Sequence, residues 1–208
     1  RDTILCHNAD LEQFRLHKDD IIKDSFKKPA RIVFAGVMIE ESCNIEVLKV
    51  FLNDVRFEHI FIGRDSSGKK LIQNFVHDFG MANVTFEGSY NKDEIINIYR
   101  ERADLINIFR AKTKVNRNAL PNKLYEAVLA GKPIVVFEHN VAISKYVTKY
   151  YLGFVIPEEK EAKVNDFIFE KMKSFSFDKY KEGRKAFLEE VEKDMKRFAE
   201  SIEMFSSK

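Results

Sequence analysis

The chain has 208 residues, enough for one α/β domain with additional helices. Its formal net charge is +2, and basic and acidic residues are interspersed, which argues against a nucleic-acid-binding groove. Two cysteines, Cys6 and Cys43, lie far apart without a metal-ligand pattern, so we expect a reduced, cytoplasmic setting. No apolar run is long enough to span a membrane, and no secretory signal is visible. The chain begins with Arg1 rather than Met, which predicts a piece of a longer protein.

Residues 1–28 form a charged lead-in that ends at Lys27-Lys28-Pro29. From residue 31 onward, short apolar segments alternate with segments of helical periodicity. The expected strands are residues 31–35, 59–62, 83–86, 104–109, 134–137 and 153–156. The expected helices lie at residues 45–52, 69–79, 91–99, 121–130 and 142–148. Ser42 and Asn91 are suited to cap the first and third of these helices.

Strands that alternate with helices at this spacing predict βαβ units and a doubly wound parallel sheet of about six strands. The polar residues 110–120 are expected to form a long loop. After Pro157, residues 159–173 and 178–205 predict two charged helices. The second carries an apolar stripe from Phe187 to Phe205, which should pack on this domain or on one outside the sequence. The expected organisation is a lead-in (1–28), an α/β domain (29–157) and C-terminal helices (158–208).

The segment from Ala119 to Phe137 predicts a helix that runs into a buried strand. Pro121 suits the first helical position, and Gly131 suits the left-handed residue beyond the helix end. Glu126 lies in an otherwise apolar turn, where a carboxylate is costly to bury without a partner. That partner is a cationic side chain, a backbone amide or the hydroxyls of a ligand, and the residues alone leave these alternatives open.

Ligands of open parallel sheets bind outside the carboxyl ends of the strands, where this chain has Gly36, Gly63, Gly88 and the 110–120 loop. The sequence lacks both the G-x-G-x-x-G and the G-x-x-x-x-G-K-[ST] phosphate motifs. The start of the helix at Pro121 is a predicted anion site, formed by the amides of residues 122–124. Glu126 follows about 7–8 Å along the axis, roughly the distance from a diphosphate to the ribose of a nucleotide.

The residues from Leu120 to Glu126, Leu-Pro-Asn-Lys-Leu-Tyr-Glu, are followed by Ala-Gly-Lys-Pro-Ile-Val at residues 130–135. This pattern resembles the donor-site motif of group-one glycosyltransferases with the GT-B fold. Its particular residues are similar to those of members that build bacterial capsule or surface polysaccharide. The order of flanking segments also matches, at residues 34–36, 86–90 and 103–107. The resemblance covers about residues 29–157.

The resemblance implies two Rossmann-like domains that face each other across a cleft. This chain would be the C-terminal domain, which binds the nucleotide sugar, and the acceptor domain would precede it. Glu126 matches the glutamate that holds the donor ribose. The implied diphosphate contacts are the amides of Asn122, Lys123 and Leu124, near the strand end at Gly36, and the implied base contacts are Ser89 and Tyr90.

Two departures from the family pattern stand out. The family often has a second glutamate eight positions before the first, near the transferred sugar, where this chain has Asn118. Many members also carry Arg and Lys after the glycine of the first strand, whereas Gly36 is followed by Val-Met-Ile-Glu-Glu. The cations for the diphosphate would then come from the 110–120 loop, or the loop is simply solvated; the candidates are Arg110, Lys112, Lys114 and Arg117.

The function expected from these features is transfer of a sugar from a nucleotide-diphospho sugar to a glycan or lipid-linked acceptor, with no metal or other cofactor and no nucleic-acid partner. One alternative is a sugar-nucleotide epimerase on the same fold, for which only His139 among the histidines is well placed, and the sequence favours a surface histidine over that role. Another is a non-catalytic binding or regulatory domain. The basic residues of the last helix also allow peripheral contact with the inner membrane face, as an alternative to a solvated surface.

Overall fold

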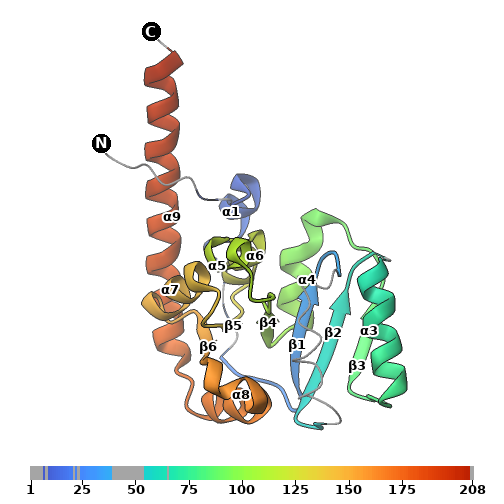
Figure 1. The fold of residues 1–208 in the computed structure, drawn as a ribbon. Coiled ribbons are helices and arrows are strands. Elements are labelled where there is room, and N and C mark those ends of the chain that lie inside the picture. Colours follow the sequence, from blue (N-terminus) through green and yellow to red (C-terminus); the bar gives the residue numbers. More distant parts are fainter. Residues whose placement is uncertain are drawn as a thin grey trace.

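A computed structural model of the chain describes residues 7, 9–20, 22, 24–38, 54–64 and 66–206. Its centre is a sheet of six parallel strands in the order β3-β2-β1-β4-β5-β6 (Figure 1). The strands are β1 Ala30–Ala35, β2 Phe57–Ile62, β3 Val84–Glu87, β4 Leu105–Asn107, β5 Ile134–Phe137 and β6 Gly153–Ile156. This is the strand order of a doubly wound Rossmann-like sheet. The predicted fold class is therefore confirmed.

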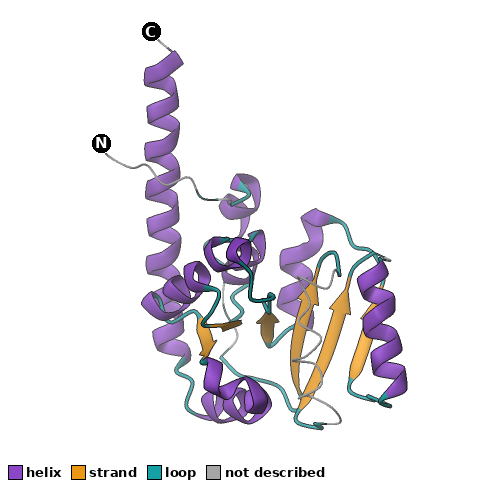
Figure 2. Ribbon diagram, in the orientation of Figure 1, coloured by secondary structure: helices purple, strands orange, loops and turns teal. Residues whose placement is uncertain are grey.

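Helices connect the strands and extend the chain after the sheet (Figure 2). They are α1 Leu11–His17, α3 Ser67–Asp78, α4 Ile95–Arg102, α5 Lys114–Asn118, α6 Asn122–Leu129, α7 Val141–Lys149, α8 Val164–Lys173 and α9 Phe177–Ser206. The 3₁₀ turns η2 Lys92–Glu94 and η3 Glu158–Lys163 lead into α4 and α8. The helix expected at residues 45–52, its cap Ser42 and both cysteines lie outside the described residues.

Alternate residues of the central strands face opposite sides of the sheet, as the strand period of two requires. Val33 and Ala35 join one core cluster with residues of α4, α6, α7 and α9. Ile32 packs with α8, and Phe34 packs with Ile72 of α3, on the other face. Both faces are covered, which explains why the strands are nearly continuous apolar runs.

Two local predictions need correction. The stretch 110–120 is not a plain loop, because Thr113 caps the short helix α5 by accepting a hydrogen bond from the Asn116 amide at 3.1 Å. Pro121 is the cap residue of α6 rather than its first helical residue, with an extended backbone of φ −74° and ψ 154°. Gly131 does adopt the expected left-handed conformation, with φ +69°.

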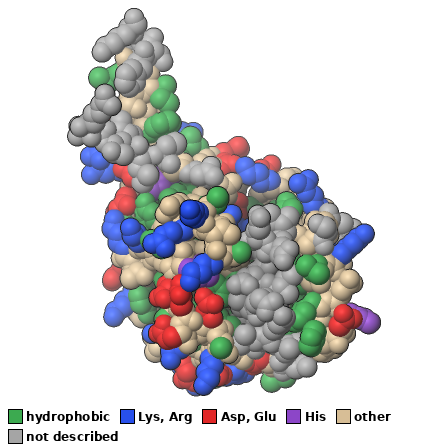
Figure 3. All heavy atoms as spheres, viewed as in Figure 1, with side chains coloured by type: hydrophobic (Ala, Val, Ile, Leu, Met, Phe, Trp, Pro, Cys, Tyr) green, Lys and Arg blue, Asp and Glu red, His purple; other side chains and the backbone are tan. Residues whose placement is uncertain are grey.

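The last helix, α9, packs on the domain along only part of its apolar stripe. Phe187 and Val191 are fully buried in the core, and Met195 is partly buried against it. Beyond that point α9 extends away from the sheet (Figure 1). Ile202 and Met204 are 49% and 70% exposed there, and apolar atoms are visible on this projecting end (Figure 3). Among the described residues, no helix combines the length and apolar character needed to cross a membrane.

Arg184 of α9 fixes the far end of α6. Its buried guanidinium donates hydrogen bonds to the carbonyl oxygens of Val128 and Leu129, at 2.7 Å and 3.2 Å. It also reaches the carbonyls of His17 and Lys18, at 3.1 Å and 3.0 Å. A cation at the carboxyl end of a helix complements the helix dipole. Arg184 therefore joins α6, α9 and the end of α1.

Candidate functional site

The end of β1 and the start of α6 meet at the carboxyl edge of the sheet. Gly36 has φ +140°, and a Cβ atom added to it would lie 2.9 Å from Nζ of Lys123. A Cβ on Gly63 would lie 2.1 Å from the carbonyl oxygen of Gly36. Lys123 Nζ also lies 4.3 Å from the ring centroid of Phe34, a cation–π contact. Glycine at both strand ends thus lets two backbones and one ammonium group approach closely.

Glu126 is half-buried on α6, one turn after Lys123. Among the residues that the structure describes, none donates a hydrogen bond to its carboxylate. Burial raises the pKa of Glu126, while the positive charges of Lys123 and Lys92 lower it and the negative charge of Asp10 raises it. A carboxylate held in this way is an acceptor without a structural hydrogen bond.

The hollow beside Glu126 is small, about 20 Å³, and α1 and η2 approach it from outside. Its lining includes Asp10, Gln13 and Lys92, and Lys92 Nζ lies 3.2 Å from the Asp10 carboxylate. Such a volume holds about one water molecule. Sequence reasoning missed Asp10 and Lys92, because their position beside Glu126 depends on tertiary packing across more than thirty residues of chain.

The loop after β3 brings Tyr90 towards Glu126. Burial raises the pKa of Tyr90, and the charge of Glu126 raises it further. Tyr99 of α4 is fully buried, and burial together with the same carboxylate raises its pKa. Ser89 is exposed on the loop that carries Tyr90. Tyr90 and Glu126 therefore lie close enough to interact electrostatically, whereas no contact joins Ser89 to Glu126 in the described part of the chain.

The first turn of α6 differs in one respect from the sequence prediction. The Leu124 amide donates a hydrogen bond to the Pro121 carbonyl at 3.0 Å, and the Leu124 side chain is fully buried. The expectation that this amide is free for a ligand is therefore wrong. Asn122 is exposed and lines the Glu126 hollow. Asn122 and Lys123 remain at the positive end of the helix dipole, where an anion is favoured.

The predicted sugar and phosphate contacts from the segment before α6 do not lie together in the structure. Arg110 is half-buried, and desolvation lowers its pKa. Arg117 and Asn118 are exposed on α5, and Asn118 lines a separate hollow of about 340 Å³ beside Lys145 of α7. Lys112, one of the candidate phosphate cations, forms an ion pair of 2.7 Å with Glu158. The structure therefore does not bring Asn118 into the Glu126 hollow.

His139, which follows β5, is buried rather than exposed. Its Nε2 lies 2.9 Å from the Arg110 carbonyl oxygen, and its Nδ1 lies 3.4 Å from Oε1 of Glu161. The imidazole also stacks on Phe137, with ring centroids 5.2 Å apart. These contacts make His139 a support for the backbone before α5. They weaken its assignment as an acid or base in an epimerase.

The groups at this edge can bind a ligand that carries an anionic group close to hydroxyl groups. Lys123 and the start of α6 supply positive charge, and Glu126 supplies a hydrogen-bond acceptor. Within the described ranges, no group of three or more His, Cys, Asp or Glu side chains is arranged to hold a metal ion.

Comparison with family models finds no match, and comparison with curated proteins finds none either. Solved structures do match. HepE from Anabaena, in complex with UDP and glucose, has a TM-score of 0.64 at 15% identity, over 85% of this chain and 48% of that one. An α,α-trehalose-phosphate synthase (UDP-forming) from Burkholderia vietnamiensis has a TM-score of 0.62 at 10% identity, over 94% and 49%.

The pneumococcal O-GlcNAc transferase GtfA, in complex with UDP and GlcNAc, has a TM-score of 0.65 at 12% identity, over 89% of this chain and 38% of that one. The chain therefore spans about half or less of the length of the structures it matches. At these identities the similarity concerns the fold. The six-stranded parallel sheet with its flanking helices is the Rossmann-like fold found in these GT-B proteins.

Proposed function

We propose that this chain is the donor-binding domain of a glycosyltransferase that uses a nucleotide-diphospho sugar. The observation that supports the proposal most directly is Glu126, a half-buried carboxylate that receives no hydrogen bond from the described residues. It lies one turn from the start of α6, at the edge of the sheet where ligands of this fold class bind. The similar folds of HepE and GtfA were both obtained in complex with UDP, which makes a UDP sugar the first donor to test.

In the proposed complex the Glu126 carboxylate accepts hydrogen bonds from the ribose hydroxyls. The start of α6 and the Lys123 ammonium lie next to the diphosphate. Charge builds up on that diphosphate as the glycosidic bond breaks, so fixed positive groups there lower the barrier. The acceptor, a glycan or a lipid-linked sugar, would be bound by a domain that precedes this one. A role in capsule or surface polysaccharide synthesis, and contact with the inner membrane face, belong to the same proposal.

A nucleotide needs more space than the hollow beside Glu126 provides, since that hollow measures about 20 Å³. The exposed ion pair between Asp10 and Lys92 closes it. Exposed pairs of this kind contribute at most about 1 kcal/mol, so a ligand can displace one at small cost. We therefore expect the Asp10–Lys92 contact to break when a nucleotide enters, which leaves Lys92 near the bound phosphates or ribose.

A thermal-shift screen with UDP, ADP and GDP tests the proposal. A ligand at one hundred times its Kd stabilises a protein by about 2.7 kcal/mol, which raises the melting temperature by several degrees for a chain of this size. Glu126→Ala should remove most of the shift, whereas the exposed control Glu101→Ala should retain it. The site assignment fails if the Glu126 variant is stabilised as much as the control.

A second candidate function is a non-catalytic domain that binds nucleotide without transferring sugar. The observations that favour it are the amide of Asn118 where a second carboxylate would be expected, and the ion pair that holds Lys112 at Glu158. Both candidates predict nucleotide binding. Turnover of the nucleotide sugar by the full-length protein, measured as release of the nucleoside diphosphate, separates them.

A further inference from the structure

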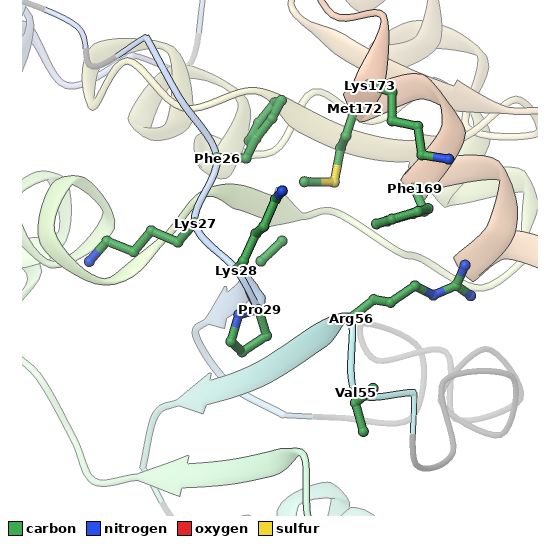
Figure 4. Close-up of a pocket in the computed structure, with 10 residues that line it drawn as sticks. Phe26, Lys27, Lys28, Pro29, Val55, Arg56, Phe169, Met172 and Lys173 are labelled. Atoms are coloured by element: carbon green, nitrogen blue, oxygen red, sulfur yellow. The ribbon is translucent and has the colours of Figure 1, made fainter.

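Another cavity lies at the opposite, amino edge of the sheet, where β1 and β2 begin (Figure 4). Its volume is about 560 Å³, within the range of about 300–1,000 Å³ that is usual for ligand pockets. The residues that line it come from the lead-in before β1, the turn before β2 and helix α8. None of the described residues that line it also lines the Glu126 hollow.

Much of the wall of this amino-edge cavity is apolar. Phe26 lies on one side of it, and Phe169 and Met172 of α8 lie on the other, with Val55 at its margin (Figure 4). Among the lining residues that the structure describes, none is Ser, Thr, Asn, Gln, Asp or Glu. A sugar or a nucleobase would therefore find few side-chain partners for its hydroxyl or ring-edge groups, and burying those groups without partners is costly. The walls favour a plain hydrocarbon body.

The charged side chains that line the cavity in the described ranges are all cationic, and they are Lys27, Lys28, Arg56 and Lys173. Arg56 is neutralised by Asp54 and Asp166, at 2.6 Å and 2.7 Å, and Lys173 by Glu170 at 2.7 Å. Lys27 and Lys28 are exposed, and no residue in the described part of the chain forms an ion pair with either. Lys28 points into the space between Phe26 and Met172, whereas Lys27 points away (Figure 4).

We propose that the amino-edge cavity binds a single-chain anionic amphiphile, with its hydrocarbon chain against Phe26, Phe169 and Met172 and its carboxylate or phosphate on Lys28. The apolar lining contributes affinity through burial of the chain, at about 0.8 kcal/mol for each methylene. The ammonium group of Lys28, which forms no ion pair with a described residue, favours a negatively charged head group. The ligand enters as a free molecule, and the proposal does not depend on what binds near Glu126.

Calorimetric titration with decanoate and decyl phosphate, each below its micelle-forming concentration, tests the assignment. Binding should weaken roughly tenfold from decanoate to octanoate, because two methylenes are lost. Decanol, which has the same chain but no charge, should bind several-fold more weakly than decanoate. Equal binding of decanol, or equal binding of octanoate, would overturn the proposal. Binding to vesicles of anionic phospholipid without binding of the free amphiphiles would also overturn it, and would identify a membrane surface instead.

The adjacent lysines provide a matched pair of variants. Lys28→Gln should weaken decanoate binding about fivefold, the upper limit for one exposed ion pair, whereas Lys27→Gln should change it less than twofold. Met172→Glu, which adds a carboxylate to the wall, should abolish binding of the anion. Circular dichroism confirms that each variant is folded before titration. Equal effects of the two lysine substitutions, or unchanged binding by the Met172 variant, would show that the anion lies elsewhere.

Discussion

The two edges of the sheet differ in how they are built. At the carboxyl edge, Gly36 and Gly63 let backbone and Lys123 approach closely, and the space beside Glu126 is about 20 Å³. At the amino edge, Phe26, Phe169 and Met172 line a cavity of about 560 Å³ together with cationic side chains. Volume alone would therefore not identify the hollow beside Glu126, although ligands of this fold class bind at that edge of the sheet. The candidate site at the carboxyl edge is identified by its charged side chains, and the candidate site at the amino edge is identified by the volume of its cavity.

The position of Glu126 and Lys123 at the carboxyl edge depends on α6, which Arg184 holds at its far end. Substitution of Arg184 is expected to have the largest effect. Arg184→Met removes the donors to the carbonyls of Val128, Leu129, His17 and Lys18. Buried acceptors that lose their donors cost about 1–3 kcal/mol each when water cannot replace them. We expect a loss of about 3–4 kcal/mol in the free energy of unfolding, measured with urea.

Arg197→Met is the control for this prediction, because Arg197 is an exposed arginine of the same helix. Its stability should stay within about 0.5 kcal/mol of the parent protein. A loss confined to Arg184 would show that α9 sets the position of α6. Equal stability of the two variants would mean that the apolar packing of α9 is sufficient.

A smaller effect is expected at Gly36. An alanine there must adopt φ +140°, and its Cβ would displace the Lys123 ammonium. Backbone strain of this kind costs about 1–3 kcal/mol. Gly88→Ala is the matched control, because a Cβ on Gly88 meets nothing within 4 Å. Urea unfolding should separate the two variants, and Gly36→Ala should also weaken nucleotide binding. Retention of nucleotide affinity by Gly36→Ala would remove Lys123 from the proposed site.

Glu126→Gln should stabilise the protein at neutral pH, by about 1 kcal/mol. Burial raises the folded-state pKa of Glu126, so the folded state binds its proton more tightly than the unfolded state does. The contribution of the protonated side chain to the free energy of unfolding is present at low pH and is lost as the pH rises through the folded pKa. At pH 7 the buried, ionised carboxylate therefore destabilises the folded state. The advantage of glutamine should therefore shrink as the pH falls through the raised folded-state pKa, and it should be smallest below about 4.5, the ordinary pKa of the group.

Unfolding curves of Glu126→Gln between pH 4 and pH 8, with the exposed Glu101→Gln as control, measure this difference. A substitution that stabilises the protein and also abolishes nucleotide binding is the signature of a residue kept for function. If Glu126→Gln instead destabilises the protein at pH 7, the carboxylate has a structural partner and the proposed ribose contact loses its main support.

The features of the fold and of the candidate site that could be predicted are those that depend on local sequence patterns. The strand at residues 134–137 and the left-handed Gly131 follow from an apolar run and from the chemistry of helix ends, so the sequence predicts them correctly. A threonine before a short helix is also a recognised N-cap signal, and Thr113 fits it, but the polar composition of residues 110–120 predicts a loop. Arg184 and the Asp10–Lys92 pair depend on contacts between distant segments, which no local pattern specifies.

The smallest effect is expected at Asn118, which lies with Lys145 in a hollow separate from that of Glu126. Asn118→Ala should therefore leave UDP affinity unchanged within a factor of two. If the sugar of the donor extends towards α7, the same substitution should weaken UDP-glucose binding about threefold to tenfold, the value of one hydrogen bond. Calorimetry with both ligands on one variant measures the ratio directly. Equal losses for UDP and UDP-glucose would place Asn118 at the diphosphate, and would join two hollows that the structure keeps apart.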